Sequence, residues 1–421
     1  GRRCLSGIPS LDDKMVQEIV RLILESIYEP IFSDASHGFR PNRSCHTALL
    51  QMQSTFTGVK WFIKGDGRDY FKKIDHAVLI TILRRRIHDE YFIALIWKFL
   101  KAGYVEDWTF HKTYSGTAQG TLIGPILLSI YLNELDRFME NYMQEEQKML
   151  YDPIQGNQKG LLKYHYHEQR DSGYRSLFYV RYANEWLCGV IGSKRDAEEI
   201  RADIGRFLEE TLKLELSEGK ALITNAHDKV HFLGYEIVAS DDERVCGNRN
   251  GYMGLARRGR VKLYVPRGKW QKRLIDYKAL EIKYQDGKEI FNPVHRSYLI
   301  NKDDLEIVRQ YNAEVRGLYN YYRIADNVSV LGHFNYVMKF SMFKTFGAKY
   351  KLHISEVRKK YGYKQFGVKY RTKQGEKILY YYEDGFTNVK NGIAKPEIDL
   401  VPKREALVLC VQCQERLHAG E

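Results

Sequence analysis

A short β-hairpin is the feature that most constrains the fold of this chain. Residues 177–190 read LFYVRYANEWLCGV, in which two runs of apolar, β-branched and aromatic residues flank an Ala-Asn-Glu tip. Such runs with so short a connection predict antiparallel strands over 177–182 and 186–191. Asn184 suits a turn, but Asn184 and Glu185 are also oxygen-bearing groups at the end of a buried ribbon. The tip is therefore a turn, a metal site or the remnant of one.

The segments around this hairpin predict a mixed α+β domain. VKWFIKGD is typical of a buried strand that ends at Asp66, and KVHFLGYEIV indicates another strand after the hairpin. Between them, Ser193 and Asp196 form a capping box before a helix with one apolar face. Strand, helices, hairpin, helix and strand in this order suit a split βαβ sheet. In such a sheet Asp66 would lie beside the tip at Asn184 and Glu185.

The rest of the chain is expected to be mainly helical, with one insertion. Apolar residues at helical spacing predict helices over residues 12–30, 75–103, 269–285, 303–325 and 330–348. Residues 143–176 are polar, charged and aperiodic, and are interpreted as an insertion. A Tyr- and Lys-rich tail follows the last long helix. The change in character predicts a domain boundary near residues 240–262.

The composition predicts the class of binding partner and the redox state of the compartment. The 421 residues include 66 basic and 53 acidic side chains, a formal net charge of +13, with 31 Tyr and 19 Phe. This combination favours a polyanionic partner, most simply nucleic acid, over a merely soluble basic enzyme. Six cysteines without a dense framework indicate a reducing compartment.

Targeting signals are not evident in the sequence. No apolar run reaches the roughly eighteen residues of a membrane helix, and no signal peptide opens the chain. We therefore expect no membrane association, and a bacterial cytoplasm or an organellar matrix rather than secretion. The first residue is Gly1, and the opening GRRCLSGIP is typical of the middle of a domain. These two features predict a fragment or a processed product.

Asp66 and the hairpin tip together have the arrangement that nucleotidyl transfer requires. That reaction uses two divalent metals about 4 Å apart, held by carboxylates. Asp66 and Glu185 would be the metal ligands, on adjacent strands. By itself the pattern is weak, because a strand-end aspartate is more often a cap or turn residue.

Six ordered blocks of the sequence resemble the group II intron-encoded reverse transcriptases, also called maturases, most closely their group IIA members. The blocks are IYEPIFSDASHGFRPNRSCHTAL, WFIKGD with the following YF and IDH, YSGTAQGT with GPILLSIYLNELD, YVRYANEW, KLELSEGKALIT with FLGYEI, and VHRSYLINKDDLEIVRQYNAEVRGLYNYY. The resemblance implies a right-hand polymerase. Partial fingers and a palm, with the split βαβ sheet and hairpin, would occupy residues 1–250. An α-helical thumb, called domain X, would occupy 251–350, and a basic, Tyr-rich region with the remnant of an HNH-type module 351–421.

The same resemblance assigns roles to single residues. Asp66 matches the first metal-binding aspartate of the palm, and Phe71 matches the bulky steric gate that excludes a 2′-hydroxyl. Arg40 lies in the Gly-Phe-Arg-Pro block of the fingers, and Gln119 lies in the loop that contacts template and incoming nucleotide. Lys220 matches a lysine that could donate a proton to the leaving pyrophosphate.

Three catalytic blocks depart from the family pattern. The family tip Tyr-Ala-Asp-Asp here ends in Asn184 and Glu185, which removes one charge and lengthens the other side chain by a methylene. Lys72 replaces an aspartate beside the gate, and Ala118 and Thr121 replace a proline and a glycine of the template loop. Losing a carboxylate that faces two dications costs several kcal/mol, a rate loss on the order of 10³. The resemblance therefore implies a metal-site remnant, with Mg²⁺ bound weakly or lost.

The C-terminal half retains the character of domain X. Residues 349–382 contain ten Lys or Arg against two Glu, interleaved with seven Tyr. Basic side chains neutralise phosphates, and aromatic faces stack on unpaired bases. The RNA-binding residues expected on this basis are Arg257, Arg258, Arg260, Arg316, Tyr321 and Tyr322. The alternative is a solvated basic surface whose tyrosines pack inward.

The last residues contain half of a metal-binding pattern. Cys410 and Cys413 have zinc-ligand spacing, and His418 would be a third ligand. Many members of the resembled family end in an HNH endonuclease with two cysteine pairs and a His-His core. This chain has neither a first cysteine pair nor a His-His, so we expect no zinc and no endonuclease activity.

Three functions stay open. The preferred interpretation is an RNA-binding maturase that assists splicing of its intron, with an impaired polymerase site. The second is an active RNA-directed DNA polymerase of a mobile intron, and the third is a decayed intron reading frame with neither activity. The implied partner is group II intron RNA, with a DNA target or primer, a dNTP and a second copy in a homodimer as further partners.

Overall fold

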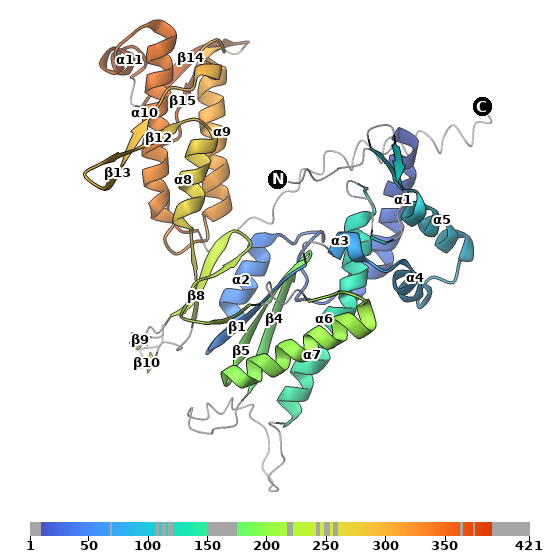
Figure 1. Ribbon diagram of the computed structural model, residues 1–421. Helices are drawn as coiled ribbons and strands as arrows, with labels where there is room; N and C mark the ends of the chain where they lie inside the picture. Colours follow the sequence, from blue (N-terminus) through green and yellow to red (C-terminus); the bar gives the residue numbers. More distant parts are fainter. Residues whose placement is uncertain are drawn as a thin grey trace, which may run out of the picture. The chain divides into compact units, whose positions relative to one another are not determined.

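The chain is divided into two compact units. The computed structural model describes residues 10–67, 70–106, 109–111, 115–116, 121–149, 175–216, 222–240, 245–247, 253–255, 260–362, 365–373 and 375–389 (Figure 1). The first unit takes Gly1–Leu233, Ala239–Val261 and Ile393–Glu421, and the second takes Gly234–Val238 and Lys262–Gly392.

A four-stranded antiparallel sheet of order β4-β5-β1-β6 organises the first unit. Its strands are β1 (Trp61–Asp66), β4 (Ser176–Tyr182), β5 (Glu185–Ile191) and β6 (Leu222–Asn225). The helices of the unit are α1 (Leu11–Tyr28), α2 (Cys45–Thr55), α3 (Tyr70–Lys73), α4 (His76–Arg84), α5 (Glu90–Lys101), α6 (Gly124–Met149) and α7 (Lys194–Leu212), with a 3₁₀ turn at Glu29–Ile31. The predicted hairpin and the strand ending at Asp66 are confirmed, and they are neighbours in the sheet.

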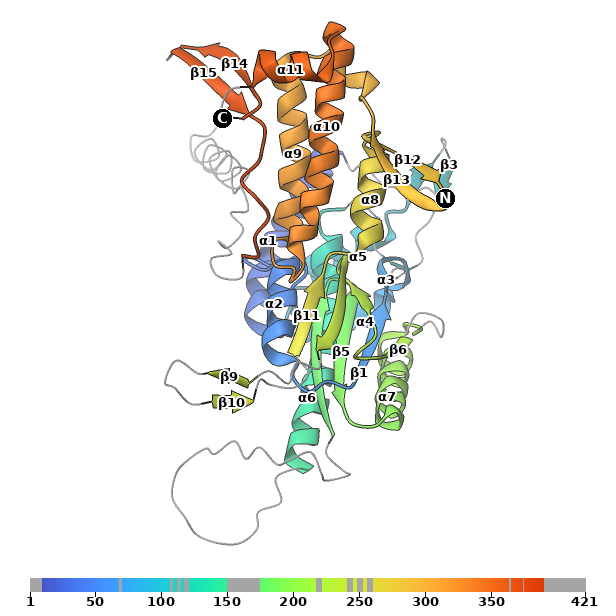
Figure 2. The same cartoon turned by 90° about the vertical axis from the view of Figure 1, so that its left-hand side faces the viewer.

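Helices cover both faces of this sheet. α2 packs on one face, while α6 and α7 pack on the other (Figures 1 and 2). Alternation along the strands divides the side chains accordingly, because successive residues point to opposite faces. Tyr179 and Cys188 belong to the core under α6 and α7, whereas Phe178 stacks on Phe56 at the end of α2, with ring centroids 5.4 Å apart.

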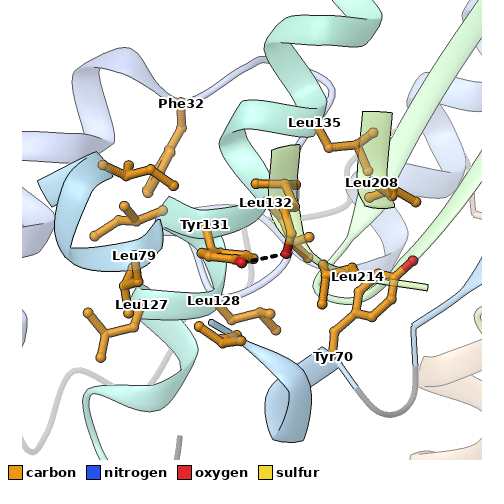
Figure 3. Close-up of a cluster of buried hydrophobic side chains, with 14 of the residues drawn as sticks. Phe32, Tyr70, Leu79, Leu127, Leu128, Tyr131, Leu132, Leu135, Leu208 and Leu214 are labelled. Atoms are coloured by element: carbon orange, nitrogen blue, oxygen red, sulfur yellow. Dashed lines mark hydrogen bonds between the residues drawn. The ribbon is translucent and has the colours of Figure 1, made fainter. Parts of the chain in front are cut away.

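The main core of the first unit lies around α6. Figure 3 shows leucines of α6 and α7 closing around Tyr131, whose hydroxyl donates to the Leu212 carbonyl at 2.5 Å. This bond ties α6 to the last turn of α7. Burying about ten large apolar side chains here contributes roughly 1.5–3 kcal/mol each. The sheet that carries the hairpin therefore packs against a well-buried apolar core.

Local sequence signals explain where several helices begin. The capping box predicted at Ser193 and Asp196 is confirmed at the start of α7. The single helix predicted over 75–103 is instead two helices, α4 and α5. Asp89 accepts bonds from the backbone N–H groups of Tyr91 and Phe92, which starts a new helix there. Residues 143–149 of the predicted insertion are instead the last part of α6, which extends to Met149, and residues 150–174 lie outside the described residues.

The remaining strands up to β11 form three smaller sheets. β7 (Val230–Phe232), β8 (Tyr235–Ser240) and β11 (Arg260–Tyr264) form a three-stranded sheet of order β11-β8-β7. Two-stranded pairs are made by β2 (Tyr104–Glu106) with β3 (Thr109–His111), and by β9 (Val245–Gly247) with β10 (Met253–Leu255).

The second unit is mainly helical. It contains α8 (Arg267–Asp276), α9 (Asp304–Tyr322), α10 (Leu331–Tyr350) and α11 (Ile354–Tyr361), two short 3₁₀ turns at Ser297–Leu299 and Val328–Val330, and the hairpins β12 (Leu280–Gln285) with β13 (Lys288–Pro293) and β14 (Gly367–Thr372) with β15 (Gly375–Tyr380). α8, α9 and α10 run side by side (Figure 2). The helices predicted over 303–325 and 330–348 are confirmed.

The prediction of one helix over 269–285 is wrong. α8 ends at Asp276, and the chain turns into the antiparallel pair β12 and β13. Asp286 and Gly287 both have positive φ, 51° and 74°, as a tight hairpin turn between strands requires. The second unit is therefore helical with an inserted hairpin.

No helix among the described residues is both long and apolar enough to cross a bilayer. The cysteines and histidine of the predicted zinc pattern, Cys410, Cys413 and His418, lie outside the described residues.

Candidate functional site

The hairpin tip and the end of β1 form the candidate site. In the strand register Asp66 lies directly opposite Glu185, so the two predicted metal ligands are on adjacent strands. The backbone N–H of Gly67 donates to the Asn184 carbonyl at 3.1 Å, which fixes the tip to the end of β1. Ala183 turns the chain with a φ of 54°. The predicted juxtaposition of strand end and tip is thus confirmed.

A cation lies near the acidic residue of the tip. The Lys64 ammonium is 3.9 Å from the Glu185 carboxylate, and both side chains are partly exposed, at 22% and 33%. Water screens such a pair, so its contribution to stability is small. Asn184 brings a neutral amide. Among the described side chains, which do not include that of Asp66, no group of three or more His, Cys, Asp or Glu could hold a metal ion.

A buried ion pair joins the hairpin to α6. The Arg181 guanidinium donates to both Asp136 oxygens, at 2.7 and 2.5 Å, and neither side chain has exposed surface. The Tyr179 hydroxyl donates to the same carboxylate at 2.9 Å. Arg181 also donates to the Ala183 carbonyl and to the Ser36 hydroxyl, each at 2.8 Å. One side chain therefore links α6, the hairpin tip and the loop that contains Ser36.

That loop, residues 33–43, lies against the edge of β4. Two backbone bonds join them: the N–H of Arg181 donates to Ala35 at 2.8 Å, and the N–H of His37 donates to Arg181 at 2.9 Å. Gly38 then passes so close to the tip that an added Cβ would lie 2.2 Å from the Ala183 nitrogen. Only glycine fits at this position without displacing the tip.

Arg40 has a structural role in this loop. Its guanidinium pairs with Glu29 at 3.0 Å and donates to the carbonyls of Ser33 and Ser36. The residue is buried, with the Phe32 ring 5.3 Å away. These contacts fix the shape of the loop beside the tip. The expectation that Arg40 contacts a nucleotide stays a prediction.

Phe71 lies on α3, close after the end of β1. Its side chain is half-buried and meets the ring of Phe39 edge-on, with centroids 6.4 Å apart. Phe39 belongs to the same loop as Gly38, has a φ of 58° and is 54% exposed. Aromatic surface is therefore present near the tip, and the steric-gate role of Phe71 stays a prediction. Gln119 and Lys220 lie outside the described residues.

The predicted RNA-binding residues differ in exposure. Arg260 and Arg316 are exposed, and the Arg316 guanidinium lies over the Tyr382 ring at 5.3 Å. Tyr321 is half-buried. Tyr322 is buried, and its hydroxyl donates to the Gly234 carbonyl at 3.0 Å. Burial raises the pKa of Tyr322 to about 12. Tyr322 therefore packs inside its unit, which corrects the expectation that it stacks on RNA.

Arg257 and Arg258 lie outside the described residues. The tyrosines of the tail also divide into two groups. Tyr361 and Tyr381 are buried, whereas Tyr380 and Tyr350 keep exposed surface. Part of the tail therefore has the inward-packed tyrosines of the alternative interpretation.

Comparison with known proteins identifies the family of this chain. Residues 1–237 match the reverse transcriptase (RNA-dependent DNA polymerase) family, and residues 260–397 match the type II intron maturase family. The group II intron-encoded protein LtrA of Lactococcus lactis subsp. cremoris is 39% identical over 408 residues, which cover 89% of this chain and 67% of LtrA. This chain belongs to the group II intron-encoded reverse transcriptase and maturase family.

Other relatives of this family are more distant. The putative COX1/OXI3 intron 2 protein of Saccharomyces cerevisiae is 32% identical over 380 residues, which cover 83% of this chain and 44% of that protein. The nuclear intron maturase 1 of Arabidopsis thaliana is 24% identical over 413 residues, which cover 82% of this chain and 57% of that protein. The predicted fold, a right-hand palm followed by a helical maturase region, is confirmed by the family matches.

The roles of three residues near the tip were not predicted from the sequence. Arg181 and Asp136 lie 45 residues apart, and Lys64 precedes Asp66 by two positions. An arginine within an otherwise apolar strand was a signal, because a buried charge requires a partner. The identity of that partner was not readable from spacing.

Proposed function

We propose that this chain is a group II intron maturase that binds intron RNA and assists splicing, with a reverse-transcriptase domain of impaired polymerase activity. The observation that carries the second part is the hairpin tip. Its single carboxylate, on Glu185, faces the Lys64 ammonium at 3.9 Å, and its other polar side chain is the amide of Asn184.

This donor set fits a two-metal centre poorly. Two dications need several negative oxygens, whereas Asn184 contributes no charge and Lys64 competes for the charge of Glu185. We infer that Mg²⁺ binds weakly here. Because charge stabilisation by metal is a large part of phosphoryl-transfer catalysis, weak binding lowers the polymerisation rate.

The RNA-binding part is supported by exposed positive charge, at Arg260 in the first unit and at Arg316 in the second. Arg260 and Arg316 are exposed, and within the described part of the chain no carboxylate pairs with either. Cations of this kind can neutralise RNA phosphates, because each contact releases counterions. The match to type II intron maturases over residues 260–397 indicates an intron as the source of that RNA.

An active polymerase is the second candidate, and one observation favours it. The backbone of the tip keeps the expected register, since Asp66 lies opposite Glu185, and the hairpin is held by the Arg181–Asp136 pair. An active enzyme would extend a primer on an RNA template at a substantial rate. A maturase with an impaired site would assist splicing and extend primers poorly.

The proposed function is tested by splicing. A group II intron precursor RNA is incubated with the purified chain at a Mg²⁺ concentration where the RNA alone splices slowly. We expect faster excision of the intron, and weaker binding of a shuffled RNA of equal length. If the chain neither accelerates splicing nor prefers the intron over the shuffled RNA, the decayed-frame interpretation replaces the proposal.

A further inference from the structure

A pocket in the second unit carries an inference that deepens the proposed RNA binding. It has a volume of about 700 Å³ and lies between α8 and α9. Pockets of roughly 300–1,000 Å³ are the usual size for small ligands and cofactors. The space therefore suits a single nucleotide rather than an RNA duplex.

Three cations line this pocket from one side of α8. Lys269, Lys272 and Arg273 are spaced so that they share one face of the helix, and all three are exposed. Within the described residues none of them forms an ion pair, whereas the neighbouring Arg267 pairs with Glu289. Unpaired cations at a concave site favour a bound anion.

The acidic residues of the pocket do not cancel this charge. The Glu314 carboxylate is held at 2.6 Å by the Arg296 guanidinium, which is buried, so its charge is already compensated. Asp276, at the end of α8, is the other acidic residue lining the pocket. The lining therefore has an excess of positive charge beside a carboxylate.

Aromatic side chains form another part of the wall. Tyr321 and Tyr277 are half-buried and line the pocket. The position of Tyr321 is fixed from behind, since its ring packs 5.0 Å from that of Tyr322 and the Tyr235 hydroxyl donates to its carbonyl. Rigid aromatic faces next to cations are what an unpaired base and its phosphate require.

We propose that this pocket binds one unpaired nucleotide of the bound RNA, with its phosphate at Lys269, Lys272 and Arg273 and its base against Tyr321. The inference rests on the proposed RNA binding. It differs from a general basic surface because a pocket accepts an extruded or single-stranded nucleotide and excludes a paired one.

Gly317 allows the pocket to be filled without disturbing the fold. It lies on α9 in the pocket wall, and an added Cβ would meet no atom within 4 Å. A leucine there would occupy the open space. Glycine is also less favourable in a helix than leucine, so Gly317→Leu is not expected to destabilise α9. Gly332 on α10, also in open space and outside the pocket, offers the matched control.

The test measures binding of the full chain to two probes, an unstructured 20-nucleotide single-stranded RNA and a blunt 20-base-pair RNA duplex. Gly317→Leu should weaken single-strand binding about tenfold, because stacking of one base contributes about 1–3 kcal/mol. Duplex binding should change less than twofold. Gly332→Leu should bind both probes as the unmodified chain does, and thermal melting of both variants should match it.

A second variant keeps the test decisive if Gly317→Leu does not fold. Lys272→Glu should weaken single-strand binding more than Lys288→Glu, an exposed lysine of β13 that does not line the pocket. Equal single-strand affinity of Gly317→Leu and the unmodified chain, or an equal loss for both probes, would overturn the pocket while the splicing result still supports the maturase. If the unmodified chain binds neither probe and does not accelerate splicing, both proposals fail.

Discussion

Arg181 and Asp136 have no exposed side-chain surface, so the stability of the hairpin depends on their mutual charge compensation. Asp136→Asn keeps the shape of the side chain and removes its charge. Breaking one partner of a buried pair typically costs about 3–5 kcal/mol, because the other charge stays buried and uncompensated. We expect the free energy of unfolding in urea to fall by that amount.

The control for this prediction is an exposed pair with the same chemistry. Lys73 and Glu215 lie 2.6 Å apart, with 46% and 76% of their side chains exposed. Solvent and salt screen such charges, so Glu215→Gln should leave the free energy of unfolding nearly unchanged. Equal losses for the two variants would mean that the buried pair does not support the tip.

The loop over residues 33–43 should make stability depend on pH through His37. Burial, with the nearby Arg43 and Arg40, lowers the pKa of His37 to about 4, below its ordinary value near 6.5. The folded state therefore binds the proton less readily than the unfolded state. Its contribution to stability is complete above pH 6.5 and is lost as the pH falls toward 4.

Chemical denaturation at pH 7 and pH 5 tests this dependence. The loss of stability between these values should be larger in the unmodified chain than in His37→Gln, by on the order of 1–2 kcal/mol. Gln keeps groups that can bond to Thr47 and Gln51, the present partners of the His37 ring. Identical pH dependence of the free energy of unfolding in both proteins would show that His37 does not cause it.

Elements with strong local signals could be predicted from the sequence, and those defined by distant contacts could not. The strands around the tip follow from apolar runs and a short turn, and α7 follows from its capping box and apolar face. β12 and β13 were missed because helical spacing was extended past Asp276. The Asp-Gly pair at 286–287 was the local signal that distinguishes a hairpin there.

The candidate site shows the same division. The register between Asp66 and Glu185 could be expected from strand order, whereas the role of Arg40 could not. Its partner Glu29 lies 11 residues earlier, and only the folded loop brings the two together. Likewise, Tyr321 and Tyr322 are adjacent in sequence but differ in burial, because tertiary packing decides which of them keeps exposed surface.

The net charge of +13 makes a prediction for the whole molecule. RNA affinity should fall steeply with salt, because each phosphate contact releases counterions, with a slope of about 0.7–0.9 per contact. Replacing Arg257, Arg258 and Arg260 together by alanine should lower that slope by about two to three units and weaken different RNAs similarly. Filter binding over a range of salt concentrations measures the slope.

Cations that are already paired give the comparison for this measurement. Lys194, Arg195 and Arg206 on α7 each lie within 3.7 Å of a carboxylate of the same helix. Their joint replacement by alanine should leave the slope nearly unchanged. If both triple variants lower the slope equally, RNA binding depends on total charge and not on the region around Arg260.

The central claim, a maturase with an impaired polymerase site, is tested most directly by the rate of primer extension on an RNA template. The unmodified chain and the double variant Asn184→Asp with Glu185→Asp are compared over a range of Mg²⁺ concentrations at saturating dNTP. We expect the double variant to extend the primer faster, by up to about 10³-fold if the tip alone limits the rate. A high rate in the unmodified chain, unchanged by the double substitution, would show that the polymerase site is not impaired.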